Sequence, residues 1–359
     1  MDGLRALAVA TVLIYHFGTM VGVPGVPGDL GVTLFFVLSG FLITWLLRRE
    51  WQATGTVSLR AFYARRTLRI FPAYYVFLAI MGSLMLVGHR RWPVGQGWAA
   101  LVYLTNYYDA FTHGGSSSIA HTWSLAVEEQ FYLLWPLAFI ALARKGRRTI
   151  IAGLAITIAA VLAWRITLIF GLHAEESYSY HAFDTRADAL AIGCLLAVVL
   201  ETQRGQALAE WLTVSSLQPI WTVAALILAR LAHPLFHPSV GYTLEAFLCA
   251  VLIVQALRLT SAAWFRWLEH PATTYIGRIS YPLYLYHGIP AFLLASAPLP
   301  AWAKLAGMVL ASIVMASGSY YLVERPFLRL KSRVKSVPTP RGTPLTPHGG
   351  LLDLPAGTV

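Results

Sequence analysis

Runs of apolar residues long enough to cross a membrane repeat along most of the chain, separated by short polar segments. A hydrocarbon core of about 30 Å takes roughly 20 predominantly apolar residues of α-helix. On that basis we predict ten transmembrane helices, at about 4–22, 30–47, 72–88, 123–143, 149–170, 187–200, 217–232, 241–257, 280–297 and 302–323. The apolar stretch 98–103 is too short to cross and is expected to be interfacial or re-entrant. The predicted fold class is therefore all-α, a polytopic integral membrane helical bundle.

The composition agrees with a membrane protein. Of 359 residues, 57% are hydrophobic and only 12% are charged, against about 25% charged residues in soluble domains. Cys194 and Cys249 both fall in apolar runs and are interpreted as buried thiols, not as a disulfide or a metal site. The net charge of +11 would suit a nucleic-acid-binding protein, so the positions of the basic residues decide its meaning.

Most of the basic residues fall on one side of the predicted bundle. The loops after the second, fourth, sixth and eighth predicted helices, and the segment after the tenth, carry Arg48, Arg49, Arg60, Arg65, Arg66, Arg69, Arg144, Lys145, Arg147, Arg148, Arg204, Arg258, Arg266, Arg278, Arg325, Arg329, Lys331, Arg333, Lys335 and Arg341. By the positive-inside rule, both termini are predicted to be cytoplasmic, and topology explains the charge without a nucleic-acid partner. We predict a transmembrane domain at 1–335 and a disordered cytoplasmic tail at 336–359.

The first predicted helix holds two ionisable residues, Arg5 and His16, that bracket ten others. Eleven helical positions turn through about 1100°, close to three revolutions, and rise about 16 Å. Both side chains are therefore predicted to lie on one face. Ionisable groups inside a membrane cost several kcal/mol and normally face a cavity or a partner, which makes this pair a functional candidate. The alternative is a snorkelling arginine and a packed histidine.

Two further polar groups interrupt the apolar pattern. Arg65 and Arg69, in the basic loop before Pro72, are four residues apart and would form one cationic patch suited to phosphate. Ordinary topogenic charge is the alternative. Glu128 and Glu129 lie near the outer end of the fourth predicted helix. Solvation at the membrane surface is the alternative for these carboxylates, since acidic residues suit a helix N-terminus.

Arg186, Asp188 and His287 are the remaining candidates. Arg186 and Asp188 enter the sixth predicted helix from the outer side and are expected to pair with each other or with neighbours. His287, in the ninth predicted helix, is by itself more typical of a satisfied core histidine than of a catalyst. Together with Glu129, these three residues are candidates for binding an acceptor or for supporting the site.

Depth connects His16 with Glu128. His16 lies roughly 20 Å along a helix that enters from the cytoplasm, and Glu128 lies about 7–10 Å in from the outer face. In a core of about 30 Å the two come to a similar level. A histidine and a carboxylate at one level can form a proton-accepting pair. Arg5, Arg65 and Arg69 would lie on the cytoplasmic side, where they could hold an anionic donor.

These residues resemble the motifs of the membrane acyltransferase-3 family, which O-acylates bacterial surface sugars, antibiotics and other metabolites. The similarity covers roughly residues 2–330. In chain order the matching pieces are DGLR with its gap to His16, FFVLSGF from Phe35, RRTLRIFP from Arg65, TWSLAVEEQFY from Thr122, RADALAIG from Arg186, GRISYPLYLYH from Gly277 and VERP from Val323.

The resemblance implies an acyl-CoA donor at the cytoplasmic face and a hydroxyl acceptor. It implies phosphate binding by Arg5, Arg65 and Arg69, and catalysis by His16 with Glu128. Family members that modify surface polymers often carry a hydrolase-like domain after the last helix. The short tail here leads us to expect either a single-step transfer or help from a partner protein.

The predicted function is thus an integral membrane O-acyltransferase of the bacterial cytoplasmic membrane, with acetyl-CoA as the expected donor and no permanently bound cofactor or metal. A surface polysaccharide and a glycosylated small molecule such as a macrolide both fit as acceptor. General-base catalysis by His16 and a transient acyl-histidine also both fit. A transporter or flippase of an acylated or anionic compound is the main rival. A purely structural membrane partner is disfavoured because it would not explain aligned ionisable groups.

Overall fold

The structure is a computed structural model that describes residues 1–22, 27–89, 94–112, 118–260 and 262–331. Every regular element in these ranges is helical. The elements are α1 (Asp2–Val21), α2 (Gly28–Thr54), α3 (Leu59–Val87), α4 (Val94–Leu101), α5 (Thr105–Phe111), α6 (Thr122–Ala143), α7 (Arg147–Ile166), η1 (Thr167–Gly171), α8 (Glu176–His181), α9 (Phe183–Val199), α10 (Gln203–Trp211), α11 (Gln218–Arg230), η2 (His237–Gly241), α12 (Tyr242–Arg258), α13 (Ala263–Arg266), η3 (Trp267–Glu269), α14 (Pro271–Arg278), α15 (Ser280–Tyr286), α16 (Gly288–Leu294), α17 (Ala301–Ser319), η4 (Tyr320–Glu324) and α18 (Arg325–Lys331). The predicted tail at 336–359 lies outside the described residues.

Seven of the described helical segments are long and apolar enough to cross a membrane. They are Asp2–Val21, Gly28–Thr54, Leu59–Val87, Thr122–Ala143, Arg147–Gly171, His237–Arg258 and Ala301–Leu330. Each overlaps one of the ten predicted spans, so the helical multi-pass fold is confirmed, whereas the count of ten is not.

The other three predicted spans are short or broken in the structure. α9 has 17 residues and α11 has 13, fewer than the roughly 20 needed to cross unaided. The predicted helix 280–297 is divided into α15 and α16 at His287. Pro290 explains the division, because its ring lacks an N–H for the carbonyl of Tyr286, four residues earlier, and clashes with it.

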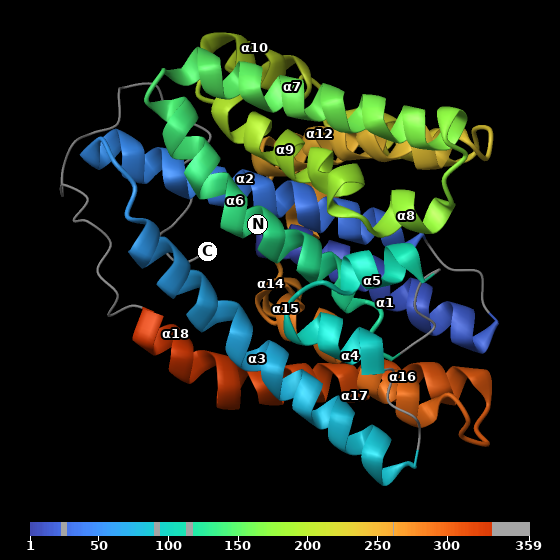
Figure 1. Cartoon of the computed structure of the whole chain (residues 1–359). Helices are drawn as coiled ribbons and strands as arrows, with labels where there is room; N and C mark the ends of the chain where they lie inside the picture. Colours follow the sequence, from blue (N-terminus) through green and yellow to red (C-terminus); the bar gives the residue numbers. More distant parts are fainter. Residues whose placement is uncertain (23–26, 90–93, 113–117, 261, 332–359) are drawn as a thin grey trace.

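α2 lies at the centre of the bundle (Figure 1), with α3, α17 and α18 along one side and α7, α9 and α12 along the other. It is the most buried of the seven candidate spans. Its backbone approaches that of α9 closely: a Cβ on Gly40 would lie 2.0 Å from the carbonyl oxygen of Leu190, and one on Gly193 would lie 2.1 Å from that of Val37. Small residues at this crossing let two membrane helices pack backbone to backbone.

The basic segment before Pro72 belongs to a long apolar helix, whereas the predicted span began only at Pro72. α3 begins at Leu59, and the Ser58 hydroxyl caps it by accepting a hydrogen bond of 3.3 Å from the Ala61 N–H. Pro72 lies inside α3 and does not open it. The arginines of this segment therefore project from a continuous helix, which fixes the direction of each one.

Candidate active site

A cavity of about 100 Å³ inside the bundle collects charged side chains from three helices. α1 contributes Arg5, α3 contributes Arg66 and Arg69, and α6 contributes Glu128 and Glu129. The remaining lining is largely apolar and aromatic, with residues from α2 and α15. Several formal charges thus share one small, mostly apolar space, where charges that lack a partner are costly.

Two of the three cavity arginines have no anionic partner within the part of the chain that the structure describes. Arg5 forms an ion pair of 3.0 Å with Asp2. The Arg66 guanidinium lies 3.7 Å from the centre of the Tyr132 ring, and its Nε has no hydrogen-bond partner. Among the described residues, neither Arg66 nor Arg69 has a carboxylate oxygen within 4.0 Å. The cavity therefore offers two guanidinium groups to an anion from outside the chain.

Arg65 does not line this cavity, which corrects its predicted grouping with Arg69. Its guanidinium lies 3.6 Å from a carboxylate oxygen of Glu50 on α2. Arg66, which the sequence analysis had not singled out, shares the cavity with Arg69. The i, i+3 spacing of Arg66 and Arg69 is as good a signal for one helix face as the i, i+4 spacing of Arg65 and Arg69, so the sequence could not choose between them.

The two glutamates of α6 differ in their contacts. Glu128 accepts a hydrogen bond of 2.6 Å from the Ser39 hydroxyl of α2. Glu129 has a buried Oε1 without a hydrogen-bond partner. The glutamates are therefore part of the arginine cavity and not solvated groups at the membrane surface, and one carboxylate oxygen there has no partner.

His16 pairs with His287 instead of Glu128. His16 Nδ1 lies 2.9 Å from His287 Nε2, while the hydrogen bond of Glu128 goes to Ser39. Among the described residues, no hydrogen bond joins His16 to Glu128. The sequence predicted a similar membrane depth for the two side chains, but depth does not determine the direction in which each helix turns its side chains. The expected histidine–carboxylate pair is thus replaced by a histidine–histidine pair.

His121, the residue before α6, completes a cluster of three histidines. Its ring centre lies 4.6 Å from that of His287, and its Nε2 lies 2.9 Å from the carbonyl oxygen of Leu285. Tyr284 connects this cluster to the arginine cavity, because it lines the cavity and its hydroxyl donates to the carbonyl of His121 at 2.9 Å. The cavity and the histidine cluster are therefore neighbouring parts of one region.

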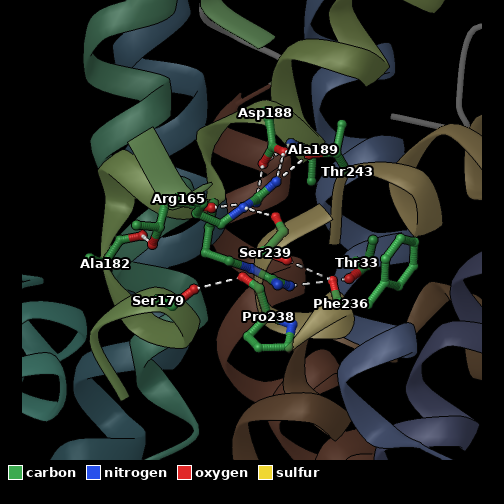
Figure 2. A network of polar contacts seen from close by, with 12 residues as sticks. Thr33, Arg165, Ser179, Ala182, Asp188, Ala189, Phe236, Pro238, Ser239 and Thr243 are labelled. Carbon is green, nitrogen blue, oxygen red and sulfur yellow. Dashed lines mark hydrogen bonds and ion pairs between the residues drawn. The ribbon is translucent and has the colours of Figure 1, made fainter. Parts of the chain in front are cut away.

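Arg186 and Asp188 do not pair with each other. Asp188 bonds Arg165 of α7 at 2.8 Å and accepts from Thr243 of α12 at 2.6 Å, as Figure 2 shows. Arg186 donates to Thr33 of α2 at 3.1 Å, and its guanidinium lies 4.1 Å from the centre of the Tyr242 ring. Neither residue lines the arginine cavity. Both connect neighbouring helices, and a supporting role for them stays a prediction.

Asp29, His237 and Glu245 could together hold a metal ion, since one ligand atom from each lies within 4.8 Å of the others. Arg230 already donates to Asp29 at 2.9 Å and to Glu245 at 3.0 Å. Its guanidinium supplies the positive charge that the carboxylates need, so we interpret the group as a structural ion-pair network.

These features define a multi-pass membrane protein with an arginine-lined cavity beside a histidine pair. A family model described as an acyltransferase domain matches residues 1–324. The chain therefore belongs to the acyltransferase-3 family, and the resemblance seen in the motifs is confirmed.

Curated relatives include O-acetyltransferases of two bacteria. The chain is 29% identical to the peptidoglycan O-acetyltransferase OatA of Listeria monocytogenes over 351 residues, 91% of this chain and 55% of that protein. It is 29% identical to the O-acetyltransferase OatA of Staphylococcus aureus over 346 residues, 91% of this chain and 56% of that protein. The chain thus spans about half the length of these relatives. No solved structure matches it.

Proposed function

We propose that the chain is an integral membrane O-acyltransferase that moves an acetyl group from acetyl-CoA to a hydroxyl group of a carbohydrate or a glycosylated small molecule. The observation that carries the proposal is the cavity lined by Arg5, Arg66 and Arg69. Arginine forms paired hydrogen bonds with phosphate oxygens, and CoA carries phosphates at one end. Membership of the family supports acyl transfer as the chemistry.

The donor binds in an extended form along α1. Arg5 and His16 are about 16 Å apart along the helix axis, and only Arg5 lines the cavity. The phosphates of CoA occupy the arginine cavity, and the linear arm that carries the thioester runs past Tyr284 toward His16. With both termini cytoplasmic, the arginines lie on the side of the membrane that supplies acyl-CoA.

His16 is the residue that handles the proton. The acceptor hydroxyl gives its proton to His16 as its oxygen attacks the thioester carbonyl, the carbon–sulfur bond breaks, and the thiolate of CoA takes the proton. A two-step route gives the same ester and thiol, with the acetyl group held for a time on His16. Glu128 and Glu129 act at the cavity, where they balance the arginine charges when no donor is bound and orient polar groups of the substrates.

The acceptor is of carbohydrate type. Peptidoglycan, named as the substrate of the Listeria relative, is a carbohydrate polymer, which favours a surface polysaccharide over a macrolide. The protein acts in the bacterial cytoplasmic membrane, takes acyl-CoA as a substrate without holding a permanent cofactor, and has no nucleic-acid partner.

Transfer of isotope from labelled acetyl-CoA tests this function. Membranes containing the wild-type protein, His16→Ala or His181→Ala are given the donor and an acceptor extract of the host. Label is then followed into small-molecule, lipid and polymer fractions. His181 is the control, because it is a partly buried histidine like His16 but forms its ring hydrogen bond with the Ser177 backbone carbonyl, at 2.8 Å, and not with His287.

We expect label in one fraction with the wild type and with His181→Ala, and no label with His16→Ala. The labelled fraction identifies the chemical class of the acceptor. Equal transfer by His16→Ala would refute the role of His16. Folded wild-type protein that transfers no label from acetyl-CoA or from longer acyl-CoA donors would refute acyl transfer and favour the rival transporter.

A further inference from the structure

A hydrogen bond joins the imidazoles of His287 and His16, and the other contacts of His287 determine which ring donates it. His287 Nε2 lies 2.9 Å from His16 Nδ1, the ring centres lie 4.9 Å apart, and the two ring planes are close to parallel, at 16° to each other. On its other side, His287 Nδ1 lies 2.5 Å from the carbonyl oxygen of Tyr284. His287 therefore connects a fixed backbone group to His16.

A carbonyl oxygen only accepts hydrogen bonds, so His287 Nδ1 carries a hydrogen. A neutral imidazole has one N–H, which leaves His287 Nε2 as an acceptor. His16 Nδ1 must then donate to it, and the lone pair of His16 lies on Nε2. The hydrogen bond from His287 Nδ1 to the Tyr284 carbonyl oxygen thus fixes the tautomer of His287, and the tautomer of His287 selects that of His16.

The surroundings of His287 favour its neutral form. Its side chain is 2% exposed, and its ring neighbours are Phe17, His121 and Tyr284 together with His16. No carboxylate in the described part of the chain lies within 4.0 Å of it. A buried cation there would lose its hydration without gaining a counter-charge.

The other ring nitrogen of His16, Nε2, differs from Nδ1 in its contacts with the described residues. Its side chain is partly exposed, in contrast to that of His287. Nε2 of His16 has no hydrogen-bond partner among the residues that the structure describes. The selected tautomer therefore places an unprotonated nitrogen at the one ring position that remains open.

We propose that His287 is a positioning residue that fixes His16 in the Nδ1–H tautomer, so that Nε2 is the atom that accepts the proton or the acetyl group. The proposal rests on the proposed function and holds for both routes given there, because each needs a lone pair on the open nitrogen. It assigns a role to a histidine that the sequence pattern favoured as a packed core residue.

Kinetics of two His287 variants test the proposal, with donor binding as the control. His287→Leu removes the acceptor, and we expect kcat per folded molecule to fall by about 10²-fold, the lower end of what proton transfer by a positioned group contributes. KM for acetyl-CoA should stay within about twofold, since His287 does not line the arginine cavity. His287→Gln returns an acceptor oxygen and should recover at least about tenfold of the loss.

The corresponding His181 variants separate tautomer control from packing. His181→Leu and His181→Gln lose a ring that is likewise bonded to a backbone carbonyl, and we expect kcat per folded molecule to match wild type. If His287→Leu and His287→Gln reduce kcat equally, or if neither changes it, the proposal is wrong even though acyl transfer itself is established.

Nitrogen-15 spectra of histidine-labelled protein in bilayers give a readout that does not depend on turnover. The His16 signals are assigned by comparison with His16→Ala. We expect the unprotonated nitrogen to be Nε2 in the wild type and in His287→Gln, and to be shared between Nε2 and Nδ1 in His287→Leu. An unprotonated Nδ1 in the wild type would overturn the proposal. An Nε2 lone pair in a protein that transfers no acyl group would refute the proposed function while upholding the tautomer assignment.

Discussion

Replacing Arg165 by leucine removes the centre of the polar network shown in Figure 2. The Arg165 side chain is 0% exposed and that of its partner Asp188 is 1% exposed. Arg165 donates to the carbonyl oxygens of Ser239 at 2.9 Å and Thr185 at 2.7 Å, bonds both carboxylate oxygens of Asp188, and donates to the Thr243 hydroxyl. One side chain therefore holds α7, α9 and α12 together.

The expected loss follows from what the substitution leaves behind. Without Arg165, the Asp188 carboxylate stays buried with the Thr243 hydroxyl and the N–H of Ala189 as donors. Removing one partner of a buried ion pair lowers the free energy of unfolding by about 3–5 kcal/mol. At roughly 2 °C per kcal/mol for a large domain, the melting temperature should fall by roughly 6–10 °C.

The assay is thermal unfolding of purified protein in one detergent, for Arg165→Leu, Asp188→Leu and the double variant. Replacing a whole buried pair by apolar residues is often nearly neutral, so the double variant should be more stable than either single one by about 2 kcal/mol. A melting temperature for Arg165→Leu within about 2 °C of wild type would refute the reasoning. So would a double variant whose loss equals the sum of the single losses.

Three further predictions concern the arginine cavity, the crossing of α2 and α9, and a buried carboxylate. Arg66→Leu should raise KM for acetyl-CoA about 10- to 100-fold, because it removes a charge-assisted contact. Arg65→Leu loses only a contact outside the cavity and should change KM less than about threefold. Equal effects of the two variants in donor titrations would contradict the cavity assignment. Gly193→Ala should lower the yield of folded protein in size-exclusion profiles, because its Cβ would meet the carbonyl of Val37 at 2.1 Å, while Gly318→Ala, with nothing within 4 Å, should not. Burial raises the pKa of Asp109, which lies outside the membrane-spanning helices, to about 6. The folded state therefore favours the neutral carboxyl group, and the free energy of unfolding should decline as pH rises from about 4 to 6 and then level off. Asp109→Asn should reduce this pH dependence in melting curves.

The sequence alone located most of the long helices, because membrane length and hydropathy decide them residue by residue. It failed where a span depends on its neighbours. The division at His287 follows from Pro290, whose missing N–H affects a carbonyl four residues earlier. The start of α3 at Leu59 depends on the Ser58 cap, whereas charge and proline had suggested that the span begins only at Pro72.

The candidate site was predicted in part for similar reasons. Helical spacing identified Arg5 and Arg69, and both line the cavity. Spacing along one helix cannot say whether Arg65 or Arg66 faces the cavity, and the prediction named Arg65. Membrane depth cannot say which way a side chain turns, and the prediction named Glu128 instead of His287 as the partner of His16. Those choices are made by tertiary packing, and only the three-dimensional arrangement of the helices supplies them.

Acyl transfer from acetyl-CoA requires that the donor is consumed as the acceptor is modified. The most direct measurement compares the CoA thiol released with the O-acetyl ester formed by purified protein in liposomes, with His16→Ala as the control. We expect one thiol per ester with the wild type, and neither thiol nor ester with His16→Ala. Passage of the acceptor across the membrane with no release of thiol would contradict it and identify a transporter.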